Sequence, residues 1–123
     1  MNTVLVYGRD PRLLETRQWL LEAEGYHVLP ISGIAQIKSI APPVDLLVVC
    51  HTVPSDECDL LLERASTHWP GVHKLVLVAR TETPSCAAKA ESFHTIEGPA
   101  KLVSLVHQLL PPNQPRAASA NTA

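Results

Sequence analysis

The chain has 123 residues, and its ten Lys and Arg residues are nearly balanced by twelve Asp and Glu residues. This length suffices for one domain with a hydrophobic core, and without a basic excess to neutralise a phosphate backbone we expect no nucleic-acid partner. No apolar run reaches the roughly 20 residues that span a bilayer, and the N-terminus lacks the features of a secretory signal, so we expect a cytoplasmic protein that binds no membrane.

The first part of the chain alternates between strand and helix patterns. Residues 3–7 (TVLVY) form a short β-branched apolar run closed by Gly8, and Pro11 is suited to the first turn of a helix that ends near Glu24. A second strand is predicted over 26–31, followed by a weak helical segment over 34–40. In the first helix, the leucines at 13, 14, 20 and 21 follow helical spacing, which predicts a solvent-facing side made of Arg12, Glu15, Arg17, Gln18 and Glu22.

The middle of the chain contains the longest buried-strand pattern, V-D-L-L-V-V-C-H-T-V-P at residues 44–54. Its apolar run predicts a third strand over 44–49, buried on both faces of a parallel sheet, with a break at Pro54. A helix is expected from about 56 to 67. Its predicted buried side consists of Leu60, Leu61, Leu62 and Ala65.

The remaining chain repeats the alternation. A fourth buried strand is predicted over 74–79, a short helix over 84–91, a weaker fifth strand over 93–96, and a last amphipathic helix from Pro99 to Leu110. The stretch 111–123 is proline-rich and then small and polar, so we expect it to be a disordered tail.

Five strands alternating with helices predict parallel pairing through right-handed crossovers. The expected fold is an α/β doubly wound sandwich of the flavodoxin-like class, with a five-stranded parallel sheet and helices on both faces. One domain would occupy residues 1–110. In such sheets, functional groups gather outside the carboxyl ends of the strands. Cys50 follows the third predicted strand and is therefore a candidate functional residue.

Several local phrases resemble the receiver domain of two-component response regulators (CheY-like), over about Thr3 to Leu110. V-L-V-Y-G-R-D-P is similar to the family's first strand and acidic loop, and D-L-L-V-V-C-H-T-V-P to its third strand, with Val53 and Pro54 at the place of the family's Met-Pro. K-L-V-L-V-A-R-T is similar to the fourth strand, and I-E-G-P to the end of the fifth.

The resemblance implies a phosphorylation site whose chemical groups are missing. Family members hold magnesium with two acidic residues and a phosphate-accepting aspartate, and bind the phosphoryl oxygens with a hydroxyl and a lysine. Magnesium prefers oxygen ligands, so the residues found here should not hold it, and Cys50 has no carboxylate to phosphorylate. In this degenerate pocket, the acidic pair corresponds to Gly8 and Arg9, the accepting aspartate to Cys50, the hydroxyl to Ala79 and the lysine to Gly98. A one-residue shift would put Asp10 in the acidic loop, but it would still leave no accepting aspartate.

The function expected from this resemblance is that of a pseudo-receiver, a stand-alone signalling domain that acts through protein contacts. We expect no catalytic residue, no metal and no cofactor, so the protein should not be an enzyme. The family's dimerisation and output face corresponds to the region from Pro84 to Leu110, which we expect to contact a signalling partner or a second copy.

Two other functions remain open. Arg9 and Arg80 follow strands and could form a small anion- or nucleotide-binding site, although Arg9 could instead pair with Asp10 or Glu97. Cys50 could be a redox-sensing thiol activated by these two arginines, or simply a small buried residue. The cysteines show no paired metal-binding spacing, which makes a site formed by Cys50, His51 and Cys58 the weakest possibility.

Overall fold

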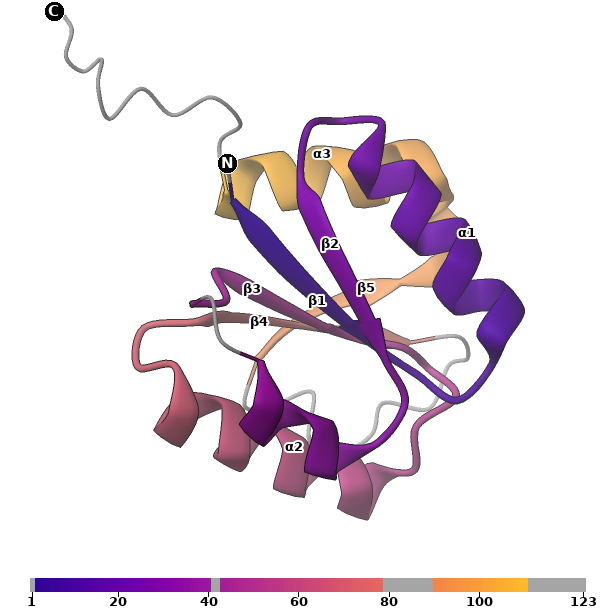
Figure 1. Ribbon diagram of the computed structural model, residues 1–123. Coiled ribbons are helices and arrows are strands. Elements are labelled where there is room, and N and C mark those ends of the chain that lie inside the picture. The colour runs from indigo at the N-terminus through magenta and orange to yellow at the C-terminus, as the bar shows by residue number, and fades with distance from the viewer. Residues whose placement is uncertain (1, 41–42, 79–89, 111–123) are drawn as a thin grey trace, which may run out of the picture.

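A computed structural model describes residues 2–40, 43–78 and 90–110, which form one parallel sheet covered by helices (Figure 1). The expected order of strands and helices is confirmed in these ranges. The elements are β1 (Thr3–Tyr7), α1 (Pro11–Glu22), β2 (His27–Ile31), the 3-10 helix η1 (Ile34–Ser39), β3 (Leu46–Val49), α2 (Ser55–His68), β4 (His73–Val78), β5 (Glu91–His94), the 3-10 turn η3 (Thr95–Glu97) and α3 (Pro99–Leu109).

The five strands pair in parallel in the order β2-β1-β3-β4-β5. This is the predicted doubly wound, flavodoxin-like sheet. All residues of β1 and β3 are buried, because helices cover both faces of the central strands. The two strands therefore end inside the molecule, side by side.

The two faces of the sheet carry separate hydrophobic clusters. Leu14 and Leu21 of α1 pack with Leu102 and Val106 of α3 on one face. The opposite face is covered by α2 and η1, with Leu61 and Ile37 in its core (Figure 1). Helix α1 thus lies on the other side of the sheet from α2.

The fifth strand differs from its prediction. It begins at Glu91 and ends at His94, whereas the strand was predicted over 93–96. Residues 95 and 96 belong instead to the 3-10 turn from Thr95 to Glu97. Only Phe93 is buried in this edge strand, so the apolar pattern was too short to fix its limits. The short helix expected over 84–91 falls mostly outside the described residues, and its last residue belongs to β5. The expected tail at 111–123 also lies outside them.

Two predicted helix faces are wrong at one residue each. Arg17 is only 9% exposed, although it was assigned to solvent, because it lies on the same side of α1 as Leu14 and Leu21. Leu60 is 38% exposed, because three consecutive leucines on a helix point in different directions and only two can face the sheet.

No helix within the three described ranges is long and apolar enough to cross a membrane.

Candidate functional site

The ends of β1 and β3 bring together three residues of the degenerate pocket, Gly8, Arg9 and Cys50. Tyr7 and Val49 are partners in the parallel register, so Gly8 and Cys50 follow at the same edge of the sheet. The Cys50 amide donates to the Tyr7 carbonyl over 2.9 Å. This backbone pairing fixes Cys50 directly beside the start of the loop that carries Arg9.

Gly8 is packed against the Cys50 side chain. A Cβ added to Gly8 would lie 3.0 Å from Cys50 Cβ, 3.1 Å from Sγ and 3.3 Å from Leu14 Cδ2. Cys50 itself is 2% exposed and belongs to the core cluster beneath α1. A carboxylate at position 8 would therefore have no room unless Cys50 or the backbone moved.

Arg17 supplies a positive charge beside Cys50, where the sequence had suggested Arg9 and Arg80. Arg80 lies outside the described residues. Burial raises the pKa of the Cys50 thiol, and the guanidinium of Arg17 opposes that rise through its charge and hydrogen bonding. The Nη1 atom of Arg17 is buried without a hydrogen-bond partner. The helical spacing of Arg17 from Leu14 and Leu21 was the signal that could have placed it in the core.

Arg9 forms an ion pair with Glu57 in the first turn of α2. The second carboxylate oxygen of Glu57 accepts a hydrogen bond from the Tyr7 hydroxyl, and the Arg9 amide donates to Thr52 Oγ1 over 3.1 Å. The expected pairing of Arg9 with Asp10 or Glu97 is wrong. Glu57 instead links the end of β1 to the start of α2.

The ionisation of this network follows from its contacts. Burial alone would raise the pKa of Glu57, but hydrogen bonds from Tyr7 and Arg9 and the Arg9 charge lower it overall. Burial and the neighbouring Glu57 raise the pKa of Tyr7, and Glu57 raises the pKa of Arg9. At neutral pH the network therefore contains a carboxylate, a guanidinium and a neutral phenol.

The remaining predicted residues have separate roles. Asp10 caps α1, because its carboxylate accepts a hydrogen bond from the Arg12 amide over 3.0 Å. Gly98 precedes α3 with φ of 93°, a conformation that favours glycine. Ala79 and Arg80 lie outside the described residues, so the proposed Arg9 and Arg80 anion site has only one described member.

The residues at this edge do not fit a magnesium ion. Glu57 already pairs with Arg9, and Asp10 is engaged at the N-terminus of α1. Cys50 and Cys58 belong to clusters on opposite faces of the sheet. Within residues 2–40, 43–78 and 90–110, no group of three His, Cys, Asp or Glu side chains is placed to hold a metal.

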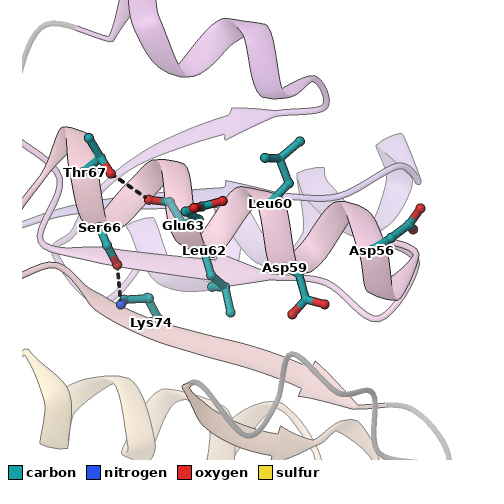
Figure 2. A pocket seen from close by; sticks show the side chains of 8 residues that line it. All are labelled: Asp56, Asp59, Leu60, Leu62, Glu63, Ser66, Thr67 and Lys74. Carbon is teal, nitrogen blue, oxygen red and sulfur yellow. Dashed lines mark hydrogen bonds between the residues drawn. The ribbon is translucent and has the colours of Figure 1, made fainter.

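A hollow of about 720 Å³ lies along α2, and its lining residues do not include Cys50 or Arg9. Figure 2 shows Asp56, Asp59 and Glu63 spread along the helix, and Lys74 of β4, which donates to Ser66 Oγ over 2.6 Å. The carboxylates lie on successive helical turns and do not converge on one point. The residues that line this hollow therefore form no compact cluster of carboxylates.

No protein-family model and no curated protein matches this sequence. Solved structures do match its fold. A response regulator receiver domain protein from Clostridium thermocellum superposes with a TM-score of 0.72 at 16% identity, covering 89% of this chain and 94% of that chain.

Two further structures extend the likeness. A Thermotoga maritima response regulator, solved in complex with a histidine kinase, has a TM-score of 0.71 at 16% identity and covers 89% of this chain and 99% of its own. A protein assigned to pilus assembly in Burkholderia thailandensis has a TM-score of 0.69 at 18% identity, with coverage of 89% and 98%. At these identities the likeness shows a shared fold.

Proposed function

We propose that this chain, which has the fold of response regulator receiver domains, is a pseudo-receiver: a signalling domain that accepts no phosphoryl group and acts through protein contacts. The observation that carries the proposal is the packing of the buried Cys50 side chain against Gly8. These two residues stand where the resemblance places the accepting aspartate and an acidic magnesium ligand.

The chemistry of the neighbouring groups supports this proposal. An acyl phosphate forms on a carboxylate oxygen, whereas Cys50 offers a buried thiol whose pKa is raised by burial. The Arg9 guanidinium, already paired with Glu57, brings a positive charge to the edge where magnesium would otherwise be needed. A second cation would meet the positive charge of Arg9 there, and the carboxylates of Glu57 and Asp10 are already engaged.

The proposed contact surface is the region from Pro84 to Leu110. Its described part comprises β5 and α3, and α3 exposes Lys101, Ser104 and Gln108 on its outer side. The response regulator solved with a histidine kinase is a receiver-fold protein that binds another protein, which supports a protein partner for this fold. We assign no catalytic residue, cofactor or nucleic-acid partner.

The decisive experiment is incubation with acetyl phosphate and magnesium, followed by intact-mass measurement. We expect no phosphorylated species, while an ordinary receiver domain treated in parallel gains one phosphoryl group. The Cys50→Asp variant restores the acceptor and should still remain unmodified, because the magnesium ligands are absent. A stable phosphorylated form of the wild-type chain would overturn the proposal.

The anion-binding alternative receives less support from the described residues. Arg9 is held by Glu57, and the cation buried beside Cys50 is Arg17. Thermal unfolding with and without a phosphate-bearing nucleotide tests it directly, since a ligand that binds the folded state raises the melting temperature. We expect no shift.

A further inference from the structure

We infer that this protein self-associates head to tail, with Trp19 of one copy inserting into the hollow between η1 and α2 of the next copy. The inference uses surfaces outside the region from Pro84 to Leu110. It does not depend on the absence of phosphorylation, because neither surface includes Cys50 or Arg9.

The first surface is centred on Trp19, near the end of α1. Trp19 is 63% exposed, whereas the other four aromatic residues of the chain are buried. Glu15 and Glu22 lie one turn before and one turn after it, and both are exposed. This Trp19 knob therefore presents a large apolar side chain between two carboxylates, a composition that favours an interface over bulk water.

The second surface is a hollow of about 470 Å³ between η1 and α2. Ile34, Ile37 and the exposed Leu60 supply its apolar lining. Pockets that bind drug-sized ligands span roughly 300–1,000 Å³, so this η1–α2 hollow is large enough for an indole ring, which is smaller than such a ligand. Its lining is completed by Lys38, Glu63, Arg64, Thr67 and His68.

The two surfaces are complementary in charge as well as in polarity. Lys38 and Arg64 give the η1–α2 hollow two positive charges against the single negative charge of Glu63. The Trp19 knob brings two carboxylates, Glu15 and Glu22. Opposite charges around an apolar centre select this pairing over knob against knob, which would bring four carboxylates together.

The position of the two surfaces determines the kind of assembly. Helix α1 covers one face of the sheet, and η1 and α2 cover the other (Figure 1). In a two-fold dimer, the knob of each copy would bind the hollow of the other copy, which requires both surfaces to lie on the same side of the molecule. Because they lie on opposite faces, each copy offers a free knob and a free hollow, which produces an open chain of subunits.

The experiment is sedimentation velocity of the full chain over increasing protein concentration. We expect species larger than a dimer in the wild type at high concentration, and at least about tenfold weaker association for Trp19→Ala and for Leu60→Asp. Both residues are exposed, so circular dichroism should show unchanged folding. His73→Ala, an exposed change at the start of β4 and outside all three surfaces, serves as the matched control and should associate like the wild type.

Mixing the two defective variants gives the sharpest test. Trp19→Ala retains an intact hollow and Leu60→Asp an intact knob, so a mixture should form a 1:1 heterodimer that grows no further. The charge-reversed pair Glu15→Lys/Glu22→Lys and Lys38→Glu/Arg64→Glu should likewise associate only when mixed. A monomeric wild type, or a Trp19→Ala variant that associates normally, would overturn the inference.

The outcome is separable from that of the proposed function. The acetyl phosphate experiment reports on the Cys50 edge, and sedimentation reports on α1, η1 and α2. A chain that assembles but becomes phosphorylated would contradict only the pseudo-receiver proposal, and a monomer that resists phosphorylation would contradict only head-to-tail assembly.

Discussion

The side chain of Cys50 fills the space that a side chain at position 8 would need. A Cβ on Gly8 would lie 3.0 Å from Cys50 Cβ, and real Cβ atoms almost never show contacts closer than this. The two residues are thus coupled through packing, although four elements of the chain, α1, β2, η1 and β3, lie between them. A substitution at either position should therefore affect the packing of the other.

Gly8→Ala should destabilise the protein by about 1–3 kcal/mol, the usual cost of an extra methyl group in a filled core. Urea unfolding measures this change in the free energy of unfolding. Gly33→Ala is the matched control, because its added Cβ would meet only Gln36 Oε1 at 3.7 Å. Equal effects of the two substitutions would contradict tight packing at Gly8.

Tyr7→Phe removes the hydroxyl that donates to Glu57 and leaves the ring in place. We expect a loss of about 1–2 kcal/mol in the free energy of unfolding, typical of a hydrogen bond to a charged group. Combining Tyr7→Phe with Glu57→Gln in a double-mutant cycle tests the link. Strict additivity of the two effects would show that the two side chains do not interact.

Glu57 should make the protein sensitive to acid. Its pKa is lowered in the folded state, so it stabilises the fold above its ordinary pKa of about 4.3, and this contribution disappears as the pH falls through the lowered value. Glu57→Gln should therefore be less stable at pH 7 and lose less stability on acidification than the wild type. Denaturant unfolding at pH 7 and at pH 3 measures both effects.

Glu63→Gln provides the control for this pH experiment, because Glu63 is exposed on the same helix. It should show the acid response of the wild type. If Glu57→Gln loses as much stability as the wild type between the two pH values, the Glu57 network does not account for the acid response.

Cys50 should react slowly with iodoacetamide in the folded protein. It is 2% exposed and burial raises its pKa, so both access and the thiolate fraction are low. Peptide mapping by mass spectrometry follows alkylation at this residue, and unfolding in urea should accelerate it by orders of magnitude. Rapid labelling in the folded state would favour the redox-sensing function instead.

Arg17→Met removes a buried charge while keeping much of the side-chain length. Because Nη1 of Arg17 has no hydrogen-bond partner, we expect the free energy of unfolding to stay within about 1 kcal/mol of the wild type or to rise. Arg12→Met on the exposed side of α1 is the control. A loss well above that range would indicate that Arg17 anchors α1 to the Cys50 edge.

The sequence by itself determined the order of elements and the chemical group that follows the third strand, the thiol of Cys50. Short apolar runs such as residues 46–49 are buried on both faces, and this local pattern is enough to predict a strand in a parallel sheet. The absence of a carboxylate at Cys50 needs no coordinates, because a thiol has no carboxylate in any conformation. The limits of the edge strand β5 were less well predicted, because its single buried residue, Phe93, does not produce the alternation of apolar and polar residues that marks a strand.

Only the tertiary structure decided which charged side chains meet. Arg9 and Glu57 are 48 residues apart, whereas the sequence suggested Asp10 or Glu97 as the partner of Arg9. The charge of Arg17 predicts exposure to solvent. Its helical position between Leu14 and Leu21 nevertheless places its side chain in the core beside Cys50. The partner of a charged side chain depends on distances between elements, which are set when the sheet and the helices pack. Local hydrophobic periodicity does not predict these distances.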